Sequence, residues 1–137
     1  MNKFCIALCL TLSTAAVGAE DFDGKKPMNC SAVQGHDCLP TQKMCNELKP
    51  DAGKGLDLNF DVMKKTVRTP YRYDLLPIQS TTNNAKSLVL QGTSLEFAWS
   101  ATIHRTTGRF TLSIADREGA YVIFGQCKVA AAKPSAP

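Results

Sequence analysis

The sequence predicts an all-β fold: a single small antiparallel β-barrel, or a sandwich, of seven to eight short strands stapled by disulfides. Short segments with apolar residues at every second position recur along the chain, and turn residues separate them at intervals of roughly eight to twelve residues. The links between them are shorter than the dozen or so residues that a parallel crossover needs, so neighbouring strands should pair antiparallel. The third observation is that four cysteines remain once an expected export signal is removed, and an even number of cysteines indicates disulfides.

Residues 1–19 have the order of features of a secretory signal peptide. Lys3 supplies the positive start, an apolar run follows from 4 to 12, and Val17-Gly18-Ala19 places small residues before an expected cleavage after Ala19. The apolar run is too short to cross a hydrocarbon core of about 30 Å. We therefore expect a periplasmic or secreted protein with no membrane span in its mature chain.

The mature chain should form one domain. Residues 20–27 are expected to be a flexible N-terminus, 28–129 the β-domain, and 130–137, which is rich in Ala, Pro and Ser, a disordered tail. The formal net charge of +4 comes from a nearly balanced set of acidic and basic groups. This balance gives no electrostatic reason to expect nucleic acid or an anionic membrane as a partner.

The strand pattern is clearest in the last third of the chain. In 95–103 every second residue is apolar, so one face of the strand should be dry and the other wet. A turn at Thr106-Thr107-Gly108 leads to the strand 109–114, and a second turn at 116–119 leads to 120–124. Segment 120–124 is apolar throughout, which predicts a strand covered on both faces.

The strands and loops before residue 95 are predicted from shorter patterns. A first strand is expected at 28–33, broken by Gly35-His36-Asp37, and residues 38–55 form a long loop with one helical turn near 41–48. Pro77 cannot donate a ladder hydrogen bond, which places its strand at an edge or a bulge. The remaining expected strands are 56–62, 66–69, 75–81 and 87–91.

Four cysteines stay in the mature chain, and an even number in an exported domain of this size indicates two disulfides. Three pairings are possible. We favour Cys30 with Cys127, which would tie the first strand to the last, and Cys38 with Cys45, which would pin the long loop. A bridge between the first and last strands favours a closed or nearly closed barrel over a sandwich.

The familiar motifs of catalysis and cofactor binding are missing from the sequence, among them the redox Cys-x-x-Cys pair, the nucleophile elbow and the phosphate-binding glycine loop. His36 and the three cysteines nearest to it lack the paired spacing of zinc ligands, and disulfide formation competes for the thiols. His104 and the pair Asp57 and Asp61 are expected on solvated strand faces. We therefore predict no enzyme, no cofactor and no metal site.

Two groups of residues are candidate binding sites. Trp99 and Phe97 lie on the dry face of their strand, either as core aromatics or as the lining of a cavity for an apolar ligand. Tyr71-Arg72-Tyr73 is either a solvated loop or a surface for a protein partner, because Tyr and Arg are enriched in interface hot spots. The expected function is an exported, non-enzymatic β-domain that binds an envelope protein or a small apolar ligand; a cell-envelope hydrolase with an unrecognised site is the alternative.

Several short motifs carry a family resemblance. They are Asp23-Gly24, Pro27 shortly before Cys30, Leu88-Val89-Leu90-Gln91-Gly92, Trp99-Ser100 and Phe124-Gly125-Gln126-Cys127. Through them the chain resembles a group of small exported bacterial β-proteins, of proteobacterial type, for which no activity is established. In size, export and disulfides it is also distantly similar to the small periplasmic β-barrel inhibitors of lysozyme. Both resemblances imply a fold and a compartment, and neither assigns a catalytic residue.

Overall fold

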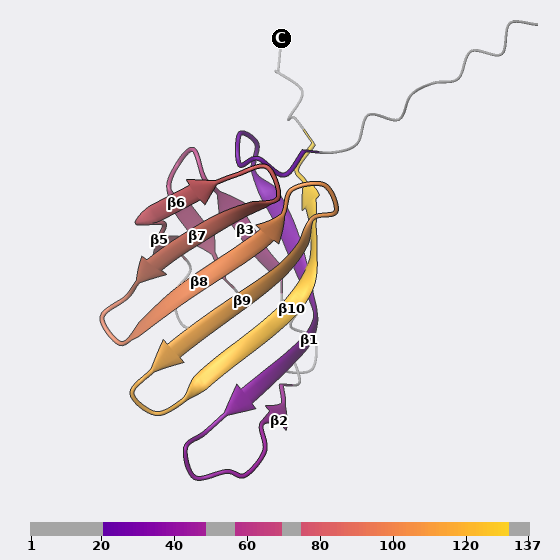
Figure 1. Cartoon of the computed structure of the whole chain (residues 1–137). Coiled ribbons are helices and arrows are strands. Elements are labelled where there is room, and N and C mark those ends of the chain that lie inside the picture. The colour runs from indigo at the N-terminus through magenta and orange to yellow at the C-terminus, as the bar shows by residue number, and fades with distance from the viewer. Residues whose placement is uncertain (1–20, 49–56, 70–74, 132–137) are drawn as a thin grey trace, which may run out of the picture.

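The computed structural model describes residues 21–48, 57–69 and 75–131, which form one antiparallel sheet that curls into a half-barrel (Figure 1). The predicted all-β, antiparallel and disulfide-bonded fold is therefore confirmed, but the strand number is wrong: the described residues form ten strands. The expected signal peptide, the Tyr71-Arg72-Tyr73 surface and the tail after residue 131 lie outside the described residues. The strands are β1 Met28–Cys38, β2 Asn46–Glu47, β3 Asp57–Asp61, β4 Thr66–Arg68, β5 Leu76–Pro77, β6 Ser80–Asn83, β7 Ser87–Thr93, β8 Phe97–His104, β9 Arg109–Asp116 and β10 Ala120–Val129.

The sheet runs in the order β5-β4-β3-β1-β10-β9-β8-β7-β6, with β2 attached to the far end of β1. In Figure 1 the strands β7 to β10 form the near wall, and β3 and β5 lie behind it. Only two residues separate the edge strands β5 and β6 in the chain. Ile78 donates its N–H to Lys65 O beside β4 (2.8 Å), and Gln79 donates to Gln91 O on β7 (2.8 Å). This short bent segment therefore links one edge of the curled sheet to the other.

The first strand is longer than the sequence predicted. Gly35, His36 and Asp37 were expected to break it, yet they pair with Ile123, Val122 and Tyr121 of β10. A bulge between Ala32 and Gln34 lets β1 continue, and it turns Val33 outward, where 81% of that residue is exposed. Pairing along the whole of β10 stabilises β1 as a strand although its residues favour a turn.

The predicted dry face of β8 is confirmed at its centre, because Trp99, Ala101 and Ile103 are all buried. The strand begins later than expected, and Leu95 lies fully exposed in the preceding turn.

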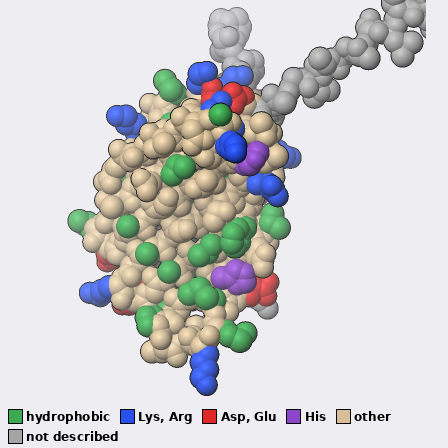
Figure 2. Space-filling view, viewed as in Figure 1, with side chains coloured by type: hydrophobic (Ala, Val, Ile, Leu, Met, Phe, Trp, Pro, Cys, Tyr) green, Lys and Arg blue, Asp and Glu red, His purple; other side chains and the backbone are tan. Residues whose placement is uncertain are grey.

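The prediction that β10 is covered on both faces is wrong. Ile123 is 3% exposed on the inner face, but Phe124 on the outer face is 41% exposed. The fold has one layer, so among the described residues no second sheet or helix covers the outside of β10. Figure 2 shows this outer face as mostly uncharged, with the charged side chains near its margins.

Residues 21–27, expected to be flexible, instead pack across one end of the half-barrel, the upper end in Figure 1. The Phe22 side chain is 3% exposed, and its N–H donates to Arg105 O (3.0 Å). The Arg105 guanidinium donates to both carboxylate oxygens of Asp21 (2.8 Å each) and to Asn83 Oδ1. We call this the closed end.

The two disulfides join the pairs favoured from the sequence. Cys30 and Cys127 face each other on β1 and β10, with their Cα atoms 3.9 Å apart, and Cys38 bonds to Cys45 across the turn between β1 and β2. The expected helical turn near 41–48 is replaced by bends and by β2. Two disulfides are typical of an oxidising, extracellular-type compartment. Within the described ranges, the chain has no helix long and apolar enough to cross a membrane.

Candidate functional site

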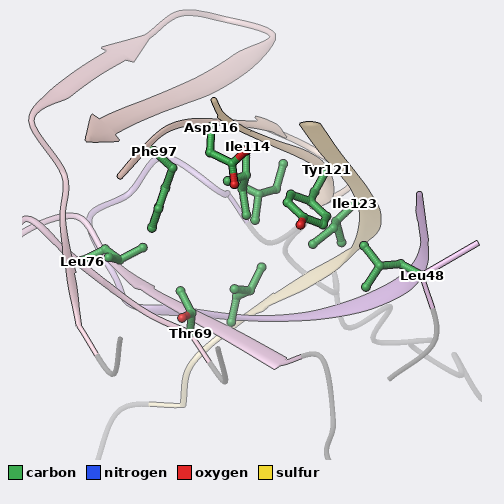
Figure 3. Close-up of a pocket in the computed structure, with 10 residues that line it drawn as sticks. Leu48, Thr69, Leu76, Phe97, Ile114, Asp116, Tyr121 and Ile123 are labelled. Carbon is green, nitrogen blue, oxygen red and sulfur yellow. The ribbon is translucent and has the colours of Figure 1, made fainter. Parts of the chain in front are cut away.

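The opposite end of the half-barrel holds a cavity of about 290 Å³ (Figure 3). We call it the open end; it carries the β7–β8 turn, the β9–β10 turn and the Cys38–Cys45 bridge, at the lower end in Figure 1. The residues that line the cavity are Leu48, Leu58, Thr69, Leu76, Phe97, Leu112, Ile114, Asp116, Tyr121 and Ile123.

Four buried aliphatic side chains form the floor of the cavity. Leu58, Leu76, Leu112 and Ile123 are 2%, 7%, 4% and 3% exposed. Leu112 and Ile123 are directly paired across β9 and β10, so both point to the same inner face. The floor offers hydrocarbon only and is therefore suited to an apolar group.

The rim consists of six partly exposed residues, and every polar side chain of the lining belongs to it. These residues are Leu48, Thr69, Phe97, Ile114, Asp116 and Tyr121. Figure 3 shows the Asp116 carboxylate and the Tyr121 ring facing the cavity from β9 and β10. The cavity thus changes from hydrocarbon at its floor to hydroxyl and carboxylate groups at its mouth.

Asp116 is held in place by the turn that follows it. Its Oδ1 accepts the backbone N–H groups of Glu118 (2.7 Å) and Gly119 (2.8 Å), and its own N–H donates to Gly119 O (3.0 Å). The sequence pattern predicted Asp116 only as the first residue of a turn. Its position on the cavity rim depends on the inward curl of β9 and could not be inferred from the turn pattern.

Leu48 reaches the rim from the segment after β2. Its N–H donates to Gly35 O (2.9 Å), and a Cβ added at Gly35 would lie 3.1 Å from Leu48 Cβ. The missing side chain at Gly35 therefore lets Leu48 pack against β1. The Cys38–Cys45 bridge closes the intervening turn and limits the positions open to this segment.

The two aromatic residues proposed from the sequence as cavity lining have different positions. Phe97 lies on the rim, whereas Trp99, 4% exposed, lies deeper and borders a space of about 20 Å³ that shares Leu58 and Leu112 with the main cavity. The Trp99 ring covers Gly92 on the neighbouring strand, where an added Cβ would come within 2.7 Å of Trp99 Nε1. Trp99 is therefore a core residue beside the cavity and does not belong to its lining.

The histidines lie apart from the cavity and from each other in the structure. His36 Nε2 is 3.0 Å from Gln34 Nε2, and His104 Nδ1 lies near the N–H groups of Thr106 and Thr107. Across the described ranges, no three His, Cys, Asp or Glu side chains are grouped so that they could hold a metal ion.

Asp57 is exposed as expected, but the interpretation of Asp61 as a solvated residue is wrong, because it is only 8% exposed. Its Oδ1 accepts the Lys64 N–H (3.0 Å), and its Oδ2 lies 3.1 Å from Lys64 Nζ. Burial raises the pKa of Asp61, but the two Lys64 groups together outweigh burial and leave that pKa below its ordinary value.

Comparisons of the chain with protein-family models, with curated proteins and with solved structures find no match. The resemblances inferred from the sequence stay predictions.

Proposed function

We propose that this protein is an exported, non-enzymatic β-domain that binds a small apolar ligand in the open end of its half-barrel. The observation that supports this proposal is the cavity of about 290 Å³ with a buried aliphatic floor. The predicted signal peptide and the two disulfides favour the periplasm or the cell exterior as its location.

The volume favours a ligand of modest size. Pockets for drug-sized molecules begin near roughly 300 Å³, and an apolar cavity of about 150 Å³ is large enough for benzene. A cavity about twice as large fits a molecule of about a dozen heavy atoms. This estimate favours short-chain or single-ring compounds over large lipids.

The composition of the lining favours binding over hydrolysis. Acid–base catalysis by carboxyl groups uses two of them in different environments, and among the described lining residues Asp116 is the one carboxylate. The same lining contains no histidine, cysteine or serine. A protein partner at Tyr71-Arg72-Tyr73, outside the described residues, has no comparable observation in its favour.

The test uses the single tryptophan as a reporter of binding. Because Trp99 borders a small space that shares Leu58 and Leu112 with the cavity, titration with 1-decanol should change its fluorescence in a saturable way. Isothermal titration calorimetry on the same samples gives a second readout that does not depend on the indole.

A matched pair of variants locates the binding. Ile114→Phe narrows the rim and should weaken decanol binding about tenfold, the equivalent of about 1.4 kcal/mol. Ser113→Phe adds a larger side chain to the neighbouring position, which is exposed on the outer face, and should leave the affinity unchanged. Absence of saturable binding by both methods, or equal effects of the two variants, would contradict the proposed function.

A further inference from the structure

We infer that the closed end of the half-barrel is a docking surface for an anionic lipid membrane. Its basic side chains outnumber its acidic ones, and an exposed methionine lies among them. The inference goes beyond the binding proposed for the open end and does not depend on it, because it concerns the opposite end of the molecule.

The fold brings basic residues from distant parts of the chain to this end. The β3–β4, β6–β7 and β8–β9 turns, the start of β1 and the end of β10 all lie here, because their strands pair antiparallel. The segment 21–27 crosses the same end: a Cβ added at Gly24 would lie 3.2 Å from Val62 and 3.3 Å from Leu88. Figure 2 shows most of the Lys and Arg side chains in view in its upper half, where this end lies. The basic residues gathered there are Lys25, Lys26, Lys64, Lys65, Lys86, Arg105, Arg109 and Lys128.

Each acidic residue described at the closed end already has a basic partner. The three nitrogen-to-oxygen distances are 2.7 Å for Arg105 with Asp21, 2.7 Å for Lys25 with Asp23 and 3.1 Å for Lys64 with Asp61. Within the described ranges, the other five bases of this end form no salt bridge, and all are exposed; we call them the basic patch: Lys26, Lys65, Lys86, Arg109 and Lys128. The closed end therefore carries a positive charge that its own acids do not neutralise.

The charge balance of the whole chain conceals this surplus. Away from the closed end, the described residues include six acidic and three basic side chains. From the sequence alone we expected no anionic partner, and the fold changes that expectation by separating the charges. Because exposed charges act over only about 10 Å at 0.1 M salt, an anionic surface would attract the basic patch rather than the molecule as a whole.

An exposed methionine next to the salt-bridged Lys64 favours lipid over nucleic acid as the partner. Met63 lies in the β3–β4 turn, is 72% exposed and directly precedes Lys64 and Lys65. Such a group suits a membrane surface, where the thioether side chain enters the acyl region and the ammonium groups stay beside the phosphates. Nucleic-acid surfaces commonly add exposed aromatic rings on which bases stack. The aromatic side chains described at the closed end are all buried: Phe22, Phe60 and Phe110.

The experiment measures co-sedimentation of the protein, purified from the exported fraction, with lipid vesicles. Vesicles of equal parts phosphatidylglycerol and phosphatidylcholine supply the anionic surface, and pure phosphatidylcholine is the neutral control. We expect binding to the anionic vesicles alone at about 0.1 M salt, and its loss at about 1 M, where the screening length is about 3 Å. Absence of binding, or equal binding to both kinds of vesicle, would overturn the inference. Tighter binding to duplex DNA at the same phosphate concentration would replace lipid with nucleic acid as the partner.

A matched pair of double variants locates the contact. Lys26→Gln with Lys86→Gln removes two charges from the basic patch and should weaken binding to the anionic vesicles at least about tenfold. Lys43→Gln with Arg117→Gln removes two charges from exposed positions at the open end and should change binding less than about threefold. Both proteins have the same net charge, so equal effects would show that net charge alone acts and would overturn the inference.

A second pair tests the apolar contact. Met63→Ser should weaken vesicle binding by about threefold to tenfold, because it removes a side chain that enters the lipid. Leu95→Ser, at a fully exposed position at the opposite end, should leave vesicle binding unchanged. Equal effects of the two serine variants would contradict insertion of the closed end. Thermal unfolding checks that every variant is folded, and an unchanged decanol affinity in the Lys26 and Lys86 variant separates this inference from the proposed function.

Discussion

The closed and open ends of the half-barrel share strands but differ in what covers them. Strand β9 runs between the two ends, and its inward residues record the difference: Phe110 is 3% exposed, Leu112 is 4% exposed, and Ile114 at the open end is only partly buried. At the closed end, Phe22 fills the space above the strands. At the open end, the described residues leave a cavity of about 290 Å³.

This difference supports the proposal that one end stabilises the fold and the other binds the ligand. The closed end has the buried Phe22 ring, the Arg105 side chain that donates hydrogen bonds to Asp21, Asn83 and Asn84, and the disulfide between the first and last strands. At the open end, the described residues leave a cavity with an apolar lining, and a local disulfide restrains the segment that carries Leu48 of its rim. Mutations at the closed end should therefore affect folding without affecting affinity, and changes at the open end should affect affinity more than folding.

The largest expected effect is the loss of the Cys30–Cys127 bridge, which spans 97 residues of chain. In the chain-entropy account, Cys30→Ser with Cys127→Ser should lower the free energy of unfolding by roughly 4–5 kcal/mol. Urea unfolding measures this loss. Protein that remains folded should bind decanol with unchanged affinity, and a weakened affinity would argue against the separation of the two ends.

The second largest effect is expected when the buried Phe22 ring at the closed end is removed. Phe22→Ala should destabilise the fold by about 3–5 kcal/mol, because the substitution removes a buried ring and leaves a cavity at the closed end. Leu95→Ala, at a fully exposed position, is the control and should stay within about 0.5 kcal/mol of the parent. A change of less than about 1 kcal/mol for Phe22→Ala would mean that residues 21–27 do not close this end.

Loss of the Cys38–Cys45 disulfide should lower stability less than loss of Cys30–Cys127, but it should also weaken ligand binding. Cys38→Ser with Cys45→Ser opens a short loop, with a separation of 7 residues, and should cost only about 2–3 kcal/mol of unfolding free energy. Because the bridge restrains the segment that carries Leu48, decanol affinity should also fall by about threefold to tenfold. Calorimetry on the folded variant measures the affinity, and an unchanged value would remove Leu48 from the binding site.

The smallest expected effect is the contribution of Asp61 to the stability of the protein at low pH. The pKa of Asp61 is lower in the folded protein than its ordinary value of 3.8, so its stabilising contribution is present above that value. The contribution is lost as the pH falls below about 4 and through the lower folded-state pKa. The variant Asp61→Asn should therefore lose less unfolding free energy in acid than the parent does. The difference should be about 1 kcal/mol or less, because Lys64 is largely exposed. Unfolding curves between about pH 2 and 7 measure it, and identical pH profiles would contradict the assigned role.

Regular alternation made most of the sheet predictable from the sequence. Leu58 and Phe60 on β3, and Trp99, Ala101 and Ile103 on β8, occupy the inner face as their spacing predicts. Of the three disulfide pairings that the sequence left open, the structure has the one that was favoured. The number of strands did not follow, because very short strands such as β2 and β5 have no periodicity of their own and exist through pairing with longer neighbours.

The features that were missed depend on contacts between distant segments. Phe22 lies in a short polar stretch, and its burial requires the end of a curled sheet to pack against. Gly35-His36-Asp37 has local turn preferences that pairing with β10 overrides. The cavity rim gathers residues from separate segments, and only Phe97 had a pattern that indicated it. Leu48 and Asp116 became candidates only once the curl of the sheet brought them together.

The most direct test of the division between the two ends is a methyl NMR titration of the Leu- and Ile-labelled protein with 1-decanol. The methyl signals of Leu112, Ile114 and Ile123 at the open end should shift and saturate together, because these side chains line the cavity. The signals of Leu88 and Ile103, fully buried near the closed end, should stay in place. Shifts confined to the closed end, or no saturable shifts at the open end, would contradict the account.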